Sequence, residues 1–380
     1  MTDIDKKETI IKAPVAKPLS ERFRILVRHI RREIKKTAYP LVANILHKRA
    51  LNKARAKNEP LNAIFMVIHE SVWKFDRLYW KMNESEDFKP TIVICPYVVQ
   101  GKEVMIRDME KAYLWYKVKG YNVVKALKSD GQWMNIKSEL KPDLILFTNP
   151  HELTKEQFQA KHYLRTLTVY VPYGHQVTKY MNYYAQYNQL FHNIIWKIFT
   201  INDMDKQISI DCSDTKGRNV EVTGYPGIDD LIDKNYTPKD VWKKQEITKK
   251  KIIWAPHHSI EDNSPLKYST FLVIADFMKA ISIEFINEIQ ISFKPHPLLM
   301  DKLYTHKDWG KNKTDDFFNF WANSSNTQLD LADYTNLFLT SDGIIHDSGS
   351  FLAEYLYVNK PALYMVADEL LTERFSPLGL

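Results

Sequence analysis

The sequence predicts an α/β protein with two doubly wound domains that face a cleft, preceded by a basic helical extension. Short apolar runs typical of buried strands alternate with helical stretches from residue 61 to about 228. The alternation restarts at residue 252, after a polar, lysine-rich segment. A chain of 380 residues is long enough for two domains. We therefore expect the extension at 1–57, the first domain at 58–235 and the second at 236–380.

The extension holds the positive charge. Residues 21–57 carry a net charge of +10, whereas the whole chain has a formal net charge of +7. Apolar residues recur there at spacings of four, three and four, which predicts a helix over 21–36: Phe23, Val27, Ile30 and Ile34. Basic residues fall on its other faces: Arg24, Arg28, Arg31, Arg32 and Lys35. Pro40 separates this helix from a second, expected at about 41–57.

This pattern leaves two interpretations of the extension open. A basic amphipathic helix is suited to lie on an anionic membrane surface, and we expect residues 21–57 to contact one. The alternative is a helix packed on its own domain with a solvated basic face. Nucleic-acid binding is disfavoured, because aromatic residues for base stacking are nearly absent from this segment.

The remaining composition indicates a cytoplasmic protein. The two cysteines, Cys95 and Cys212, form no Cys-x-x-Cys pair, which argues against a disulfide framework and a zinc site. No apolar run reaches the length of a membrane-spanning helix, and the first twenty residues lack the apolar core of a secretory signal.

In the first domain we expect a parallel sheet interleaved with helices. The predicted strands are 62–71, 90–98, 122–127, 143–149, 167–174, 197–202 and 219–224. The predicted helices are 102–118, 154–165 and 180–196. The polar stretch 229–251 then contributes no evident core residue, and we expect a hinge there, with Gly224, Pro226 and Asp229 at its start.

The second domain repeats the pattern. Strands are predicted at 252–256, 288–297, 337–342, 343–347 and 361–366, and helices at 268–283, 314–322 and 350–357. The chain stops at "RFSPLGL", soon after the last strand, so we expect that a further helix could be missing at the C-terminus.

Polar side chains follow four of the predicted strands, where ligands of such sheets bind. These candidates are His175; His257, His258 and Ser259; Lys294 and His296; and Asp347, Ser348, Ser350 and Glu354. Gly349 would let the backbone approach a ligand, and the helix that follows would direct N–H groups toward an anion such as a diphosphate. Glu354 could accept hydrogen bonds from a ribose. The alternative is an ordinary capped turn.

The histidines suit a transferase that moves a phosphoryl-linked group. Such an enzyme needs a base for the acceptor hydroxyl and donors for the leaving diphosphate, and imidazole can serve either role. Metal binding is the weaker alternative, since no His-x-x-x-His pair is present and the aspartates are not clustered with the histidines. We expect no metal and no cofactor.

In this order, the motifs resemble the CDP-glycerol glycerophosphotransferase family, which includes teichoic-acid polymerases and primases. The residues that carry the resemblance are Gly224-Tyr225-Pro226-Gly227-Ile228-Asp229-Asp230-Leu231, Ala255-Pro256-His257, Lys294-Pro295-His296-Pro297, Asp347-Ser348-Gly349-Ser350 with Glu354, and Lys360-Pro361. The resemblance implies a GT-B-like fold of two Rossmann-like domains and a CDP-linked alditol donor held by the second domain. It also implies that His296, Ser348 and Ser350 face the diphosphate.

Two departures from the family pattern affect the interpretation. The family's catalytic histidine precedes a glycine in Trp-His-Gly, whereas here the nearest stretch is Tyr173-Gly174-His175, with His175 as the candidate base. The Asp-Ser-Gly-Ser-x-x-x-Glu turn also resembles that of UDP-N-acetylglucosamine 2-epimerases. The Gly-x-Arg-Pro-Glu loop of those enzymes is absent after the first strand, which disfavours an epimerase.

The leading hypothesis is therefore a transferase that moves glycerol phosphate, or a related alditol phosphate, from a CDP-linked donor. The acceptor would be a lipid-linked or cell-surface polysaccharide at the inner face of the membrane, and CMP would be released. Two alternatives stay open: a nucleotide-sugar glycosyltransferase of capsule or lipopolysaccharide synthesis, and a non-catalytic nucleotide-binding assembly module.

Overall fold

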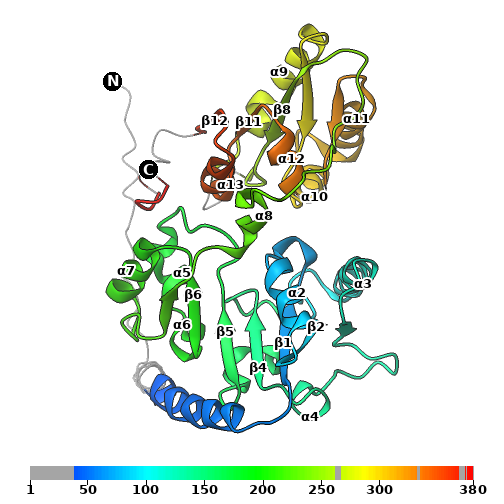
Figure 1. Cartoon of the computed structure of the whole chain (residues 1–380). Helices are drawn as coiled ribbons and strands as arrows, with labels where there is room; N and C mark the ends of the chain where they lie inside the picture. The colour runs from blue at the N-terminus through cyan, green and yellow to red at the C-terminus, as the bar shows by residue number, and fades with distance from the viewer. Residues whose placement is uncertain (1–37, 262–266, 332–333, 368–372, 374, 380) are drawn as a thin grey trace, which may run out of the picture.

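The computed structural model describes residues 38–261, 267–331, 334–367, 373 and 375–379 (Figure 1). It contains two parallel sheets, one above the other in the view of Figure 1, which confirms the predicted fold class. The helix expected over 21–36, with Arg24, Arg28, Arg31, Arg32 and Lys35, lies outside the described residues.

The first sheet has seven parallel strands in the order β3-β2-β1-β4-β5-β6-β7. They are β1 (Leu61–Val67), β2 (Phe88–Ile94), β3 (Val123–Lys125), β4 (Leu144–Phe147), β5 (Leu167–Tyr170), β6 (Lys197–Thr200) and β7 (Val220–Val222). The α-helices between them are α2 (Asp76–Glu84), α3 (Lys102–Val118), α4 (Ile136–Glu139), α5 (Tyr184–Tyr187), α6 (Leu190–Ile194) and α7 (Asp203–Cys212). Five consecutive residues of β1 are buried, as expected for a central strand covered on both faces.

The second sheet has five parallel strands in the order β10-β9-β8-β11-β12. They are β8 (Lys250–Ala255), β9 (Ile289–Phe293), β10 (Thr327–Leu329), β11 (Gly343–His346) and β12 (Ala362–Tyr364). Its α-helices are α9 (Phe271–Glu284), α10 (Leu299–Thr305), α11 (Gly310–Asn323), α12 (Thr335–Thr340) and α13 (Gly349–Glu354). Trp254 packs among Phe271, Phe293 and Trp321 in its core.

Three predicted elements are wrong. Residues 154–165 form two 3₁₀ turns, η2 (Glu156–Phe158) and η3 (Ala160–His162), instead of a helix. Residues 180–196 are broken by positive φ angles at Met181, Asn182 and Tyr183. Residues 337–342, predicted as a strand, belong largely to α12.

Residues 337–342 were predicted as a strand but belong largely to α12, because Lys360, about twenty residues further along the chain, stabilises the end of this helix. The Lys360 ammonium donates to the carbonyl oxygens of Phe338, Leu339 and Ser341, at 3.2, 2.7 and 2.6 Å. A cation at a helix C-terminus stabilises the carbonyls left without partners there. The Lys-Pro pair that the sequence associates with the nucleotide region therefore caps a helix.

The expected second helix of the extension covers residues 38–55 and packs on the first domain, below its sheet in Figure 1. Ala43 and His47 are buried, and the His47 ring lies 3.4 Å from the Thr168 hydroxyl of β5. Leu41, Val42 and Ile45 remain more than 45% exposed. None of the described helices is long and apolar enough to cross a membrane.

Packing changes from one domain to the other near Gly224, whose φ of +90° is strained for any residue with a side chain. After it come η5 (Pro226–Ile228) and α8 (Asp229–Ile232), which Arg77 of α2 ties to the first domain through Asp230 at 2.7 Å and Asp233 at 2.5 Å. Ile228, Leu231 and Trp242 pack in the core cluster that also contains Ile253, Leu337 and Phe338. The stretch 229–251 therefore does contribute to a core.

Candidate active site

The polar loops of the second domain meet at one edge of its sheet. β8 and β11 are neighbours, with Ala255 opposite His346, so the loops that follow them lie together. The loop after β9 joins them, because the His296 amide donates to the carbonyl of Pro256 at 3.1 Å. Three of the four strand-end motifs predicted from the sequence are therefore gathered in one place.

Asp347 holds these loops from the inside. Its carboxylate accepts hydrogen bonds from the His257 amide at 2.5 Å and from the Thr270 amide and hydroxyl at 2.5 and 2.8 Å. The side chain is 1% exposed, and this burial raises the pKa of Asp347 to about 6. Both carboxylate oxygens of Asp347 accept hydrogen bonds from the protein, so Asp347 stabilises the loops of the candidate site.

Three histidine rings form what we call the imidazole cluster: His257, His258 and His296. The ring centroids of His257 and His258 are 4.3 Å apart, and those of His258 and His296 are 4.2 Å apart. The sequence placed these residues at two separate strand ends, and the fold brings them into contact.

Hydrogen bonds fix the tautomers of two of the rings. In His257, Nδ1 accepts from the Ser259 amide at 3.2 Å and lies 2.9 Å from the Ser259 hydroxyl. That hydroxyl already accepts from the amides of Tyr268 and Ser269, so its own proton points to His257. In His296, Nδ1 accepts from the Leu298 amide at 3.1 Å. The proton of each neutral ring is therefore on Nε2, which becomes a donor.

The position of the ring protons indicates whether the imidazole cluster can bind a cation or an anion. One ring nitrogen from each of the three histidines lies within 4.8 Å of the others, a spacing that a metal ion could use. A metal ligand must offer a lone pair, however, and Nε2 of His257 and His296 carries a proton. An oxyanion accepts such N–H groups directly. No other trio of metal-binding side chains occurs in the part of the chain that the structure describes.

The imidazole cluster is neutral at physiological pH. Burial lowers the pKa of His257 to about 2, of His258 to about 4 and of His296 to about 3. Lys302 acts in the same direction on all three, and neighbouring histidines do so on His257 and His296. Lys302, one turn into α10, pairs with Glu261 at 2.5 Å and was not predicted from the sequence. The only signal for Lys302 in the sequence was its position on the helix that follows the Lys294-Pro295-His296-Pro297 loop.

The Ser-Gly-Ser turn lies beside the cluster and contacts the first domain. The hydroxyls of Ser348 and Ser350 make no hydrogen bond to any described residue, and Ser348 does not cap α13. A Cβ added to Gly349 would lie 3.2 Å from a methyl group of Val177. Gly349 therefore allows the turn to pack closely against Val177 of the first domain, whereas we expected it to let the backbone approach a ligand.

Two further candidates have protein partners. Lys294 forms an ion pair with Asp330 at 3.3 Å, and both side chains are 9% exposed. Glu354 is 2% exposed and accepts a hydrogen bond from Tyr334, which in turn accepts from the Lys74 ammonium at 2.9 Å. Lys74 belongs to the first domain, so this chain of contacts joins the two domains next to the turn.

His175 lies on the first-domain side of the same contact region. Both of its ring nitrogens are buried, and neither has a hydrogen-bond partner among the described residues. Its ring contacts Tyr225 at 4.9 Å and Tyr357 of the second domain at 5.7 Å, between centroids. Burial lowers the pKa of His175 to about 4, so the ring is neutral with one lone pair available.

The loop that carries His175 is pressed against the Ser-Gly-Ser turn. A Cβ on Gly174 would lie 3.8 Å from that of Ser350, and the Tyr225 hydroxyl donates to the Tyr173 carbonyl at 2.8 Å. Sequence reasoning missed Tyr225, Tyr334, Tyr357 and Lys74, because nothing in their local pattern distinguishes them from core aromatics and surface lysines.

Two parallel sheets with these loops between them define the class of protein, a GT-B-like α/β fold. Residues 174–371, just over half of the chain, match the family described as CDP-Glycerol:Poly(glycerophosphate) glycerophosphotransferase. The chain therefore belongs to this family of transferases, as the resemblance predicted. No curated protein matches the chain.

Two solved structures of UDP-N-acetylglucosamine 2-epimerases have a similar fold. A UDP-N-acetylglucosamine 2-epimerase aligns at 16% identity over 83% of this chain and 81% of its own, with a TM-score of 0.52. The Methanocaldococcus jannaschii UDP-GlcNAc 2-epimerase in complex with UDP-GlcNAc and UDP aligns at 13% identity over 79% and 82%, with a TM-score of 0.50. A variant of the wall teichoic acid polymerase TagF aligns at 13% identity over 92% and 79%, with a TM-score of 0.45.

Proposed function

We propose that this transferase moves glycerol phosphate, or a related alditol phosphate, from a CDP-linked donor to a lipid-linked or cell-surface polysaccharide acceptor. One observation carries the proposal: two imidazole N–H groups and two serine hydroxyls, with no hydrogen-bond partner among the described residues, belong to loops that meet at the switch point of the second sheet. These are donors for a diphosphate. They lie within the residues that match the glycerophosphotransferase family.

In this proposal the acceptor hydroxyl attacks the phosphorus that carries the alditol. The bond from that phosphorus to the bridging oxygen breaks, and its electron pair leaves with CMP. His296, Ser348 and Ser350 donate hydrogen bonds to the diphosphate oxygens, with His258 beside them, and Ser259 orients His257. Neutral donors favour this leaving group without the penalty of burying a fixed cation.

His175 is the proposed base. Its neutral, unpartnered ring can take the proton of the acceptor hydroxyl. A pKa of about 4 makes a weak base, but a bound diphosphate brings negative charge nearby, which raises the pKa of an imidazole. We assign Lys294, Asp347, Gly349 and Glu354 supporting roles around the donor, and Gly224, Pro226 and Asp229 a role in setting the angle between the domains.

The test is release of CMP. Purified protein with CDP-glycerol and a lipid-linked acceptor should form CMP and an acceptor extended by one glycerol phosphate, detected by mass spectrometry. UDP- and GDP-linked donors serve as controls. Turnover of a nucleotide sugar in place of CDP-alditols would support a glycosyltransferase, and nucleotide binding without turnover of any donor would support an assembly module.

We further propose that residues 21–57 bring the enzyme to the inner face of the membrane. The described helix 38–55 carries exposed Leu41, Val42 and Ile45 together with Lys48 and Arg49, and no acidic residue. Apolar side chains beside cations suit an anionic bilayer surface. Vesicles with anionic lipid should retain the full chain and lose it after deletion of residues 1–37. Equal retention on neutral vesicles would contradict the proposal.

A further inference from the structure

The first domain contains a crevice at the place where the second holds its imidazole cluster. In the second sheet the strand order reverses between β8 and β11, and in the first sheet it reverses between β1 and β4. Open α/β sheets bind ligands at the carboxyl ends of the strands, where the order reverses. The topology therefore predicts a second binding position, in the first domain.

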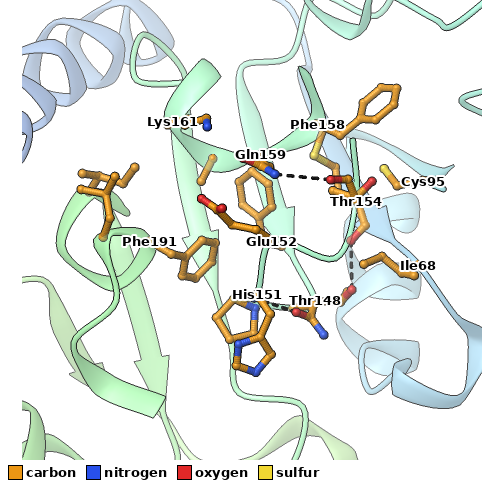
Figure 2. Close-up of a pocket in the computed structure, with 17 residues that line it drawn as sticks. Ile68, Cys95, Thr148, His151, Glu152, Thr154, Phe158, Gln159, Lys161 and Phe191 are labelled. Atoms are coloured by element: carbon orange, nitrogen blue, oxygen red, sulfur yellow. Dashed lines mark hydrogen bonds between the residues drawn. The ribbon is translucent and has the colours of Figure 1, made fainter. Parts of the chain in front are cut away.

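A cavity occupies this position (Figure 2). It lies between Met66 and Ile68 at the end of β1, Cys95 after β2, and the loop that follows β4. Its volume is about 50 Å³, whereas one water needs on the order of 10–15 Å³ measured in the same way. The space fits a short group of a few non-hydrogen atoms and is too small for a nucleobase or a sugar ring.

Most of the cavity wall is carbon. Phe147 and Phe191 meet edge to face at 5.7 Å between ring centroids, and Phe158 closes another side. Among the polar groups of the lining, the Thr154 hydroxyl and Oε1 of Gln159 are buried and have no hydrogen-bond partner among the described residues. Nε2 of Gln159 donates to the Thr154 carbonyl at 3.3 Å, which fixes the amide orientation (Figure 2). Buried polar atoms without partners are destabilising, so this pair points to a ligand.

His151 adds a third polar group to the lining. Its Nδ1 accepts from Nε2 of Gln189 at 2.9 Å, and the same amide nitrogen donates to the Ala185 carbonyl at 2.7 Å. Burial lowers the pKa of His151, so its ring is neutral and carries its proton on Nε2. The lining of the cavity therefore includes a neutral imidazole beside a hydroxyl and an amide acceptor.

We propose that this cavity binds a short hydroxylated group of the acceptor, such as a glyceryl or hydroxymethyl end. A ligand hydroxyl can donate to Gln159 and accept from Thr154, while its CH₂ carbons pack on the phenylalanine rings. The lining does not favour an anion, because Lys161 is paired with Glu156 at 3.0 Å and the carboxylate of Glu152 also lines the cavity, so we assign a neutral group. Assigning it to the acceptor rests on the proposed function.

The position of the cavity agrees with an acceptor. Phe191 of the cavity wall contacts Tyr170, the last residue of β5, at 5.1 Å between ring centroids. The chain runs directly from Tyr170 into the loop that carries His175. The cavity and the proposed base therefore belong to adjacent strand ends of one domain, whereas the proposed diphosphate donors belong to the other.

Thr154→Val tests the inference with a matched control. It removes an unpaired hydroxyl, and we expect the KM for the acceptor to rise about tenfold while the KM for CDP-glycerol stays unchanged. The control is Thr148→Val. The Thr148 hydroxyl donates its proton to the Met66 carbonyl at 3.0 Å and has none left to donate to a ligand, so this variant should lower the melting temperature and leave the acceptor KM unchanged. An unchanged acceptor KM in Thr154→Val would overturn the inference.

A second measurement keeps this test separate from that of the proposed function. Glycerol titrated into protein labelled at isoleucine methyl groups should shift the NMR signals of Ile68 and Ile194, which line the cavity, to saturation. Thr154→Val should weaken this binding. If wild type releases no CMP but the signals shift, the proposed function fails and the cavity stands as a polyol site. If the signals do not shift, the cavity assignment fails whatever the activity.

Discussion

The two domains have the same strand order around their reversal point but carry opposite kinds of site. In the second domain, backbone amides and Ser259 hold the rings of His257 and His296 and place the proton of each ring on Nε2. In the first domain, the His175 ring, the Thr154 hydroxyl and Oε1 of Gln159 are buried and have no hydrogen-bond partner among the described residues, and the His175 ring packs on aromatic side chains. The strand order thus fixes where ligands go, and the loops decide their chemistry.

This difference matches the demands of a transfer between two substrates. A diphosphate is the same in every donor, so rigid donors that need no rearrangement stabilise it best. A base works best where water is excluded and its lone pair is not already engaged. Burial lowers the pKa of His175 and of the cluster rings alike, and hydrogen bonding separates the roles that we propose for them.

The largest expected effect tests the first domain. His175→Ala should lower kcat by about 10²–10⁴-fold, the usual contribution of a general base, and leave CDP affinity unchanged. CMP release and calorimetric CDP binding measure the two quantities. His47→Ala is the matched control, because burial lowers the pKa of His47 to about 4 as well, yet its ring contacts Thr168 within β5 and is not part of the contact region that holds His175. Full turnover in His175→Ala would remove the base from the mechanism.

The next effect tests the second domain. His296→Ala removes one oriented N–H donor, and we expect CDP to bind about 10–100-fold more weakly, in line with a hydrogen bond to a charged group. His306→Ala is the control. Its Nδ1 accepts from the Asp308 amide at 3.2 Å, the same local geometry as in His296, but outside the imidazole cluster. Equal losses in both variants would mean that the ring acts through the fold alone.

The sequence predicts most of the fold, since buried strands such as β1 and β8 are continuous apolar runs between polar loops. It fails where distant residues decide local structure. Lys360 caps α12 from about twenty residues away. Phe158 and Ala160, two positions apart, are both buried against the first domain, which 3₁₀ turns permit and one amphipathic helix does not.

The candidate site is predicted in part. Polar residues after strands indicate which loops converge, because carboxyl ends of parallel strands share an edge. The local sequence does not indicate, however, in which direction each of these side chains points. Asp347 points inward to the His257 amide, and Gly349 faces Val177, although both belong to the turn expected to hold the donor. The cavity escaped prediction because Thr154 and Gln159 stood in a segment interpreted as a helix.

The third prediction concerns the dependence of stability on pH, where the effect of each residue is smaller. The rings of the imidazole cluster have folded pKa values of about 2 to 4, below the value near 6.5 of the unfolded chain. As pH falls below about 6.5, the unfolded chain binds protons that the folded rings do not, so stability is lost. Each ring should contribute about 1 kcal/mol of loss by pH 5.5.

Asp347 acts in the opposite direction, because its folded pKa of about 6 lies above its unfolded value, and its protonation offsets part of the loss. Calorimetry at pH 7.5 and 5.5 should show a melting temperature several degrees lower at pH 5.5. The decrease should be smaller in His257→Asn. A melting temperature independent of pH would mean that the rings are solvated.

The smallest expected effect concerns the contact between the domains. Gly349→Ala places a methyl group 3.2 Å from Val177, tighter than normal packing, and either side must move by a few tenths of an ångström. We expect a several-fold decrease in turnover with unchanged CDP affinity, since the shift separates the loop of His175 from the Ser-Gly-Ser turn. Adding Val177→Ala makes room for the methyl group and should restore most of the activity. If the double variant is no more active than Gly349→Ala, the glycine is needed for its own conformation or for the donor, and the two halves of the site do not depend on this contact.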